Sequence, residues 1–235
     1  MDKRTWIIFI VAVVAILAGL VMVSRQESVD VSGIDHTKIQ TASDTAPIGD
    51  HVYGNKDSKV VVIEYGDFQC PGCGNFHTNF EPLMEEYKDD MTFVFRNFPL
   101  TSIHPNARAA AAAVEAAGLQ DKYWEMWNLV FENQNAWSSS AASERDARFR
   151  SYAQELKLDM TKYEDAIASD KVSQKINFDQ SLGKDNGVTG TPSLFVNGKE
   201  IPTEEYNSTE TIRATLDKAL KDAGVEKTSD KKKSE

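Results

Sequence analysis

The stretch Val60-Val-Val-Ile-Glu-Tyr-Gly-Asp-Phe-Gln-Cys-Pro-Gly-Cys73 decides the fold, because an apolar run ends at two cysteines in C-x-x-C spacing and a helical pattern follows. The run over residues 60–65 is β-branched and apolar without alternation, which is typical of a central strand buried on both faces. Cys70 and Cys73 are the only cysteines of the chain. A disulfide between them would close a loop too short to stabilise the fold much. A reactive pair is therefore the favoured interpretation.

The position of the pair indicates different roles for the two thiols. Pro71 suits the first position of a helix, because its missing N–H would have no partner there. The amide groups and the dipole at a helix N-terminus stabilise a thiolate and lower the pKa of a cysteine at that end. Cys73 would lie one turn further on, on the same face and shielded by Cys70. We therefore expect Cys70 to be the attacking thiol and Cys73 to be the resolving thiol.

Metal or haem binding is the alternative use of such a pair. A structural zinc ion needs four ligands, whereas Cys70, Cys73 and His77 supply three, and the sequence has no second C-x-x-C or H-x-x-x-H motif. Covalent haem attachment needs C-x-x-C-H, and position 74 is a glycine. The sequence therefore predicts neither a metal ion nor another cofactor.

The N-terminal residues predict a membrane anchor. Residues 6–23 form an uninterrupted apolar run, long enough to cross most of a bilayer's hydrocarbon layer as a helix. Lys3 and Arg4 precede it, which favours a cytoplasmic N-terminus and an extracytoplasmic location for the rest. A cleaved signal peptide is the alternative, although its apolar core is usually shorter and no clean small-x-small site precedes Ser24. We expect a cytoplasmic stub and a retained transmembrane helix over residues 1–23.

Composition divides the remaining chain into three parts. Residues 24–58 are polar and predict an extracytoplasmic tether, residues 59–224 have the length of one domain, and the charged residues 225–235 predict a disordered tail. The net charge of -10 argues against nucleic acid or anionic lipid as a partner. Outside the cytosol, a cysteine pair can work as an oxidant.

The pattern within the domain is strand, helix, strand, a helical block, a hairpin and a closing helix. The first two strands are expected at residues 60–65 and 91–98, and the Asn197-Gly198 turn predicts a hairpin of 193–196 with 199–201. Helices are expected at residues 106–118, 122–132, 147–156, 160–183 and 209–223. This order predicts an α/β, thioredoxin-like fold with an inserted helical subdomain over about residues 101–186, preceded by one N-terminal transmembrane helix.

Over about residues 45–224 the chain resembles the DsbA-like thiol-disulfide oxidoreductases of the thioredoxin superfamily, most closely the membrane-anchored forms of bacteria that lack a conventional periplasm. The motifs that carry the resemblance are Phe68-Gln-Cys-Pro-Gly-Cys73, Phe98-Pro-Leu100 with His104-Pro105, and Gly187-Val-Thr-Gly-Thr-Pro-Ser-Leu-Phe-Val-Asn-Gly198.

The resemblance implies three further site residues. Pro192 is expected to be cis and to face the cysteines, which leaves the backbone of Thr191 free to pair with an extended substrate; an ordinary trans proline that opens a strand is the alternative. Glu64 interrupts an apolar strand, so its carboxyl group should be desolvated, with a raised pKa, and should shuttle a proton for Cys73. A carboxylate that reaches solvent at the edge of the sheet is the alternative for Glu64.

The dipeptide Pro71-Gly72 differs from the Pro-His pair of the strongest oxidants that the family contains. A histidine could stabilise the Cys70 thiolate and glycine cannot, which puts strong oxidant behaviour in doubt. Thr191 is ambiguous, because disulfide isomerases of the superfamily also carry threonine before the cis proline. Isomerases generally add a dimerisation domain, for which the residues between the anchor and the domain are too few.

The expected function is that of an extracytoplasmic enzyme of a bacterial cell membrane that forms disulfides in secreted or surface proteins. Reduced substrate proteins are the expected partners, and a quinone-linked membrane protein is expected to re-oxidise the cysteine pair. The exchange itself requires no flavin or metal ion. A disulfide reductase or isomerase is the alternative within enzymes, and a peptide-binding chaperone module is the alternative from another class.

Overall fold

The computed structural model describes Arg4, Trp6, Phe9, Ile10, Val13 and residues 29–43 and 45–228. Among these residues no helix combines the length and the apolar character that a membrane span requires. The transmembrane helix predicted within residues 1–23 lies mostly outside the described residues. Residues 229–235, the last part of the predicted tail, lie wholly outside them.

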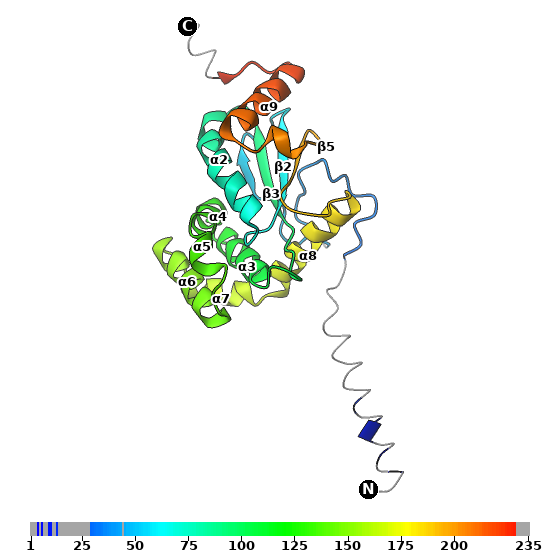
Figure 1. The fold of residues 1–235 in the computed structure, drawn as a ribbon, viewed down its shortest axis with the longest axis vertical. Coiled ribbons are helices and arrows are strands. Elements are labelled where there is room, and N and C mark those ends of the chain that lie inside the picture. The colour runs from blue at the N-terminus through cyan, green and yellow to red at the C-terminus, as the bar shows by residue number, and fades with distance from the viewer. Residues whose placement is uncertain are drawn as a thin grey trace.

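A five-stranded sheet with strand order β1-β3-β2-β4-β5 forms the centre of the domain (Figure 1). The strands are β1 (Val52–Gly54), β2 (Val61–Gly66), β3 (Thr92–Asn97), β4 (Ser193–Val196) and β5 (Lys199–Glu200). β2 and β3 are parallel, and the other neighbouring strands are antiparallel. The predicted strands and the hairpin are confirmed to within one residue at each end.

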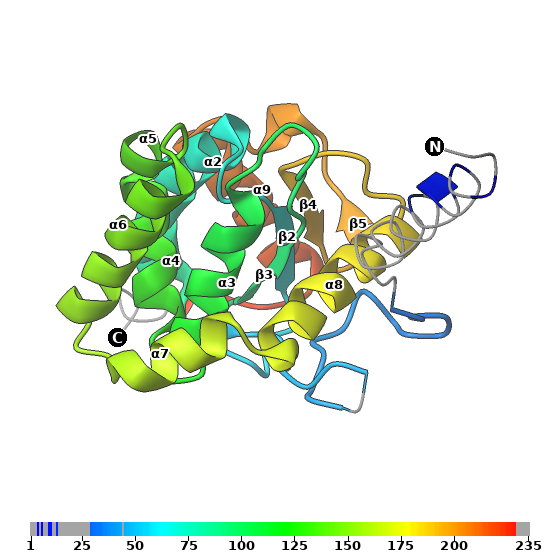
Figure 2. The ribbon, with the colours of Figure 1, turned by 90° about the horizontal axis from the view of Figure 1, so that it is seen from below.

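Helices fill both faces of the sheet and the connection between β3 and β4. They are α2 (Pro71–Tyr87), α3 (Ala107–Gly118), α4 (Tyr123–Glu132), α5 (Gln134–Trp137), α6 (Ala142–Glu155), α7 (Met160–Ile167), α8 (Asp170–Asp185) and α9 (Thr209–Asp222), with a 3-10 turn η1 (Thr203–Glu205) before α9. The helical insertion between β3 and β4 is therefore confirmed. α2 and α9 cover one face, and α8 crosses the other (Figure 2).

Two predicted helices have different bounds in the structure. The helix predicted from residue 147 begins at Ala142. The helix predicted over residues 160–183 is two helices, α7 and α8, because Ser169 interrupts it and caps α8 by accepting a hydrogen bond from the Val172 N–H.

The segment predicted as a tether over residues 24–58 is in large part packed on the domain. Val31 and Ile48 are buried, and β1 pairs with β3 at the edge of the sheet. The domain therefore begins before residue 59.

Arg96 of β3 explains why this segment packs there. Its guanidinium group is fully buried, pairs with Asp50 at 2.8 Å and donates to the carbonyl groups of His36 and Lys38, each at 2.6 Å. A buried guanidinium is costly unless such acceptors surround it. The N-terminal segment supplies these acceptors and closes the α8 side of the sheet.

The C-terminal tail likewise begins later than residue 225. The Lys227 ammonium lies 3.7 Å from the centre of the Tyr87 ring and pairs with Glu86. The amide and hydroxyl groups of Thr228 both donate to the buried Asp90 carboxylate. These contacts attach the chain beyond α9 to the end of α2.

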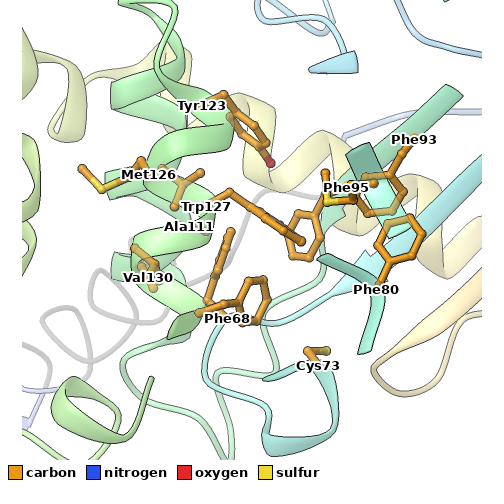
Figure 3. Packing of buried hydrophobic residues seen from close by; sticks show 14 of the residues in the cluster. Phe68, Cys73, Phe80, Phe93, Phe95, Ala111, Tyr123, Met126, Trp127 and Val130 are labelled. Atoms are coloured by element: carbon orange, nitrogen blue, oxygen red, sulfur yellow. The ribbon is translucent and has the colours of Figure 1, made fainter. Parts of the chain in front are cut away.

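Alternation along β2 gives the two faces of the sheet different roles. Ile63 and Tyr65 pack on the α8 side with Phe195, whereas Val62 belongs to the core on the α2 side. Glu64 shares the face of Val62, because side chains two residues apart lie on the same side of a strand. Figure 3 shows the aromatic core between α4 and the sheet, with Cys73 at its edge.

Candidate active site

The two cysteines lie where the chain passes from β2 into α2. Cys70 is the N-cap residue with an extended backbone, and Pro71 is the first helical residue, as the sequence predicts. Both cysteines are free thiols. Cys70 is 9% exposed and Cys73 is 0% exposed. Cys70 is therefore the sulfur that another protein can reach.

The surroundings of Cys70 favour its thiolate. The Cys73 thiol, as a hydrogen-bond donor, is the largest cause that lowers the pKa of Cys70, which falls to about 5 although partial burial opposes the shift. The Thr191 side chain and the backbone N–H groups of Cys73 and Gly72 lower it further. These amides belong to the first turn of α2, where N–H groups lack helical partners. Cys70 is thus poised to be both a nucleophile and a good leaving group.

Cys73 has the opposite character. Burial raises its pKa well above that of a free cysteine, and the neighbouring Cys70 and Glu64 raise it further. The backbone N–H of Asp67 donates to its sulfur at 3.4 Å. Cys73 is therefore a thiol in the reduced protein and must take up a proton whenever it leaves a disulfide.

Glu64 lies beneath the cysteines, in the central strand β2. Its side chain is 0% exposed, and neither carboxyl oxygen has a hydrogen-bond partner among the described residues. Burial raises the pKa of Glu64 well above its ordinary value, and interaction with the Cys73 thiol offsets this rise only in part. The alternative of a carboxylate that reaches solvent at the edge of the sheet is therefore wrong.

The loop before β4 faces the cysteines from the other side. The Thr191-Pro192 peptide bond is cis, and the Cys70 sulfur lies 3.3 Å from the Thr191 carbonyl oxygen, to which it can donate only when protonated. Tyr206 donates to the Pro192 carbonyl at 3.0 Å. The structure thus brings Thr191 and Pro192 to the cysteine pair.

Gly72 allows α2 to approach this loop closely. A Cβ atom at position 72 would lie 3.1 Å from Pro192 Cδ and 3.6 Å from Cys70 Sγ. A side chain at this position would therefore lie directly beside the reactive sulfur and the cis proline. This is the position that a histidine occupies in the Pro-His dipeptide of the strongest oxidants.

The buried carboxylate of Asp67 is a structural element of the site that the sequence did not single out. It accepts hydrogen bonds from the Gln69 N–H at 2.7 Å and from the Leu100 N–H at 2.8 Å. The His104 ring lies 2.8 Å from the same carboxylate. Asp67 thereby joins the loop after β3 to the loop that carries Cys70. An aspartate three residues before C-x-x-C, with a histidine in the loop after β3, is the pattern that could have indicated this link.

His77 is not directed at the cysteine pair. Its ring packs against Trp127 and Phe131, and its Nε2 atom lies 3.1 Å from Asn128 Oδ1. The zinc alternative therefore gains no ligand from His77, and no cluster of three or more metal-ligating side chains occurs within the described part of the chain.

Comparison with known proteins places this site in a family. A family model described as thioredoxin matches residues 46–218. Na⁺/H⁺ antiporter NhaA 1 of Salinispora arenicola is 38% identical over 156 residues, which cover 65% of this chain and 22% of that protein. NhaA 1 of Mycolicibacterium vanbaalenii is 36% identical over 156 residues, 65% of this chain and 24% of that protein. The match spans about a quarter of the length of these relatives or less.

Solved structures cover the domain more completely. Wolbachia pipientis α-DsbA1 has a TM-score of 0.63 at 25% identity and covers 74% of this chain and 92% of its own. BdbD from Bacillus subtilis has a TM-score of 0.62 at 24% identity and covers 78% of this chain and 98% of its own, which shows a shared fold. The chain belongs to the thioredoxin family, and its structural neighbours include DsbA-type thiol-disulfide oxidoreductases.

Proposed function

We propose that the protein introduces disulfide bonds into secreted or surface proteins on the outer face of a bacterial membrane. The observation that carries this proposal is the position of Cys70 at the N-cap of α2, beside the buried Cys73 and the cis Pro192. These surroundings lower the pKa of Cys70 to about 5. Stabilising the thiolate stabilises the dithiol form relative to the disulfide. The disulfide of such a pair is a strong oxidant.

The exchange begins at Cys70, since Cys73 is completely buried. A substrate thiolate attacks the Cys70 sulfur of the oxidised pair, a substrate–Cys70 disulfide forms, and the Cys70–Cys73 bond breaks to release Cys73 as a thiolate. The second thiolate of the substrate then attacks the substrate sulfur of the mixed disulfide. Cys70 leaves as a thiolate, and its low pKa favours this step. The substrate gains a disulfide, and the enzyme gains two electrons.

Glu64 supplies the proton that Cys73 needs on leaving. Burial raises the pKa of its carboxyl group well above the ordinary glutamate value, and interaction with the Cys73 thiol offsets this rise in part. A proton passed from Glu64 to Cys73, directly or through water, avoids an unpaired thiolate in the core.

The low pKa of Cys70 favours oxidation over the reductase or isomerase alternative. The doubt about a strong oxidant arises from the absence of a histidine at position 72. In this site the stabilisation comes from Cys73, Thr191 and the amides of the first turn instead. The geometry thus supplies a stabilised thiolate without the histidine.

Catalysis requires that the reduced pair be re-oxidised. We assign this step to a quinone-linked membrane protein, and we assign anchoring in the same membrane to the apolar residues 6–23. Both assignments rest on the sequence and the family, and the exchange at Cys70 uses protein groups alone.

Disulfide transfer to a reduced protein tests the proposal. The oxidised enzyme would be mixed in equal amount with a reduced, unfolded protein that has two cysteines, without glutathione. An oxidant should transfer its disulfide nearly completely within minutes. A mixture in which the enzyme keeps its disulfide and the substrate keeps its thiols would refute the proposed direction.

A further inference from the structure

One side chain of the helical insertion, that of Gln134 at the start of α5, contacts the backbone of the reactive loop directly. The Gln134 Nε2 group donates to the carbonyl oxygen of Phe68 at 2.8 Å and to that of Cys70 at 2.9 Å. The Cys70 carbonyl also accepts the first helical hydrogen bond of α2, from Gly74 N–H at 3.1 Å. Gln134 thereby fixes the backbone on which the attacking sulfur is carried.

The packing of α5 within the insertion fixes the position of Gln134. Trp137 lies one turn later in α5, is completely buried, donates to the Val130 carbonyl at 2.8 Å and packs edge-on against Phe149. α5 is therefore held between α4 and α6, and the position of the Gln134 amide follows the position of the insertion.

Gly74 makes room for this amide on α2. A Cβ atom at position 74 would lie 2.7 Å from Gln134 Oε1, a separation that real Cβ contacts do not show. Gln134 therefore lies flat against the first turn of the redox helix, and the approach depends on a glycine at that position.

A reciprocal contact runs from the loop to the insertion. Gln69 Nε2 donates to the Ser138 carbonyl at 2.7 Å, and Gln69 Oε1 accepts from the Asn106 N–H at 2.6 Å. The residues just before Cys70, Phe68 and Gln69, are thus bonded to the insertion in both directions, which restricts the conformations that the loop can adopt.

We propose that Gln134 is a positioning residue through which the helical insertion sets the redox properties of Cys70. The two hydrogen bonds are present in the dithiol form. Forming the disulfide brings the Cys70 sulfur within bonding distance of Cys73, and the loop carbonyl groups that Gln134 holds resist this movement. Contacts fitted to the dithiol form stabilise it relative to the disulfide. Gln134 therefore makes the pair a stronger oxidant than C-P-G-C alone would be.

The test compares Gln134→Met, which keeps the length of the side chain and removes both donors, with Gln154→Met on the exposed face of α6. Gln134→Met should raise the pKa of Cys70, measured by thiolate absorbance. It should also shift the equilibrium with glutathione about three- to tenfold toward the disulfide, the range expected for one or two lost hydrogen bonds. Gln154→Met should change neither quantity.

A folded Gln134→Met protein whose pKa and glutathione equilibrium match those of Gln154→Met would overturn the proposal. A second measurement uses the wild-type protein and does not depend on the folding of a variant. The side-chain amide protons of Gln134 should exchange with solvent more slowly in the dithiol form than in the disulfide form, and equal exchange would overturn the proposal too. Neither readout depends on the net direction of disulfide transfer, so failure here is distinguishable from failure of the proposed function.

Discussion

Replacing Glu64 with glutamine should change how the stability of the protein depends on pH. The side chain is 0% exposed and its oxygens have no hydrogen-bond partner among the described residues, so burial raises the pKa of Glu64 in the folded state. The unfolded chain loses this proton near the ordinary glutamate value of 4.5. Above that pH, unfolding releases a proton, and a rise in pH therefore favours unfolding. Glutamine cannot titrate and removes this dependence.

The pH dependence of the free energy of unfolding is set by the one proton that Glu64 releases on unfolding. A group that is protonated when folded and ionised when unfolded costs about 1.4 kcal/mol of stability per pH unit. The wild type should therefore lose stability relative to Glu64→Gln at up to about 1.4 kcal/mol per pH unit as the pH rises above 4.5, until the folded-state carboxyl group itself ionises. The stabilising contribution is complete below pH 4.5 and disappears as the pH rises through the folded-state pKa of Glu64.

Urea unfolding of the disulfide forms at several pH values measures this difference, because neither thiol can titrate there. Glu81→Gln, an exposed glutamate of α2, is the matched control and should leave the pH dependence unchanged. The exchange rate of Glu64→Gln should also fall, by about tenfold or more, since the amide cannot supply a proton to Cys73. Parallel stability curves for the wild type and Glu64→Gln would contradict a protonated Glu64 in the folded protein. An unchanged exchange rate from pH 5 to 9 would contradict the role of Glu64 as proton donor to Cys73.

Three further changes test other parts of the site. Cys73→Ala should trap reductant-sensitive mixed disulfides at Cys70, visible as shifted bands on gels; trapping with Cys70→Ala instead would reverse the two roles. Gly72→His should lower the pKa of Cys70 and raise the reduction potential, about 30 mV corresponding to about 1.4 kcal/mol, and a redox titration in which the potential falls would contradict this. His104→Leu should destabilise the protein by about 1–3 kcal/mol in urea unfolding, because the buried Asp67 carboxylate loses a partner; unchanged stability would show that this contact is not needed.

Local chemistry made the redox centre predictable from the sequence. Pro71 sets the first turn of α2 and places Cys70 at its N-cap, and both effects act over a few neighbouring residues. Glu64 could be recognised because a carboxylate within an apolar strand must be buried when the strand is central. The order of strands and helices along the sequence then made the sheet and the helical insertion predictable.

Contacts between distant segments were not predictable in the same way. The packing of residues 31–50 depends on Arg96, a single charged residue within an apolar strand, whose acceptors lie far away in the sequence. Gln134 lies in a helix too short to produce a periodic pattern. Its role depends on two carbonyl oxygens of the cysteine loop, and no local pattern identifies such partners.

The equilibrium of the cysteine pair with glutathione measures how oxidising the disulfide is. Contacts from Cys73, Thr191 and the first turn of α2 stabilise the Cys70 thiolate and should make the disulfide oxidising. We expect a reduction potential closer to about -120 mV, the value of a strong oxidant, than to about -270 mV, the value of a thioredoxin reductant. A potential near about -270 mV would contradict an oxidising Cys70–Cys73 pair and would favour a reductase.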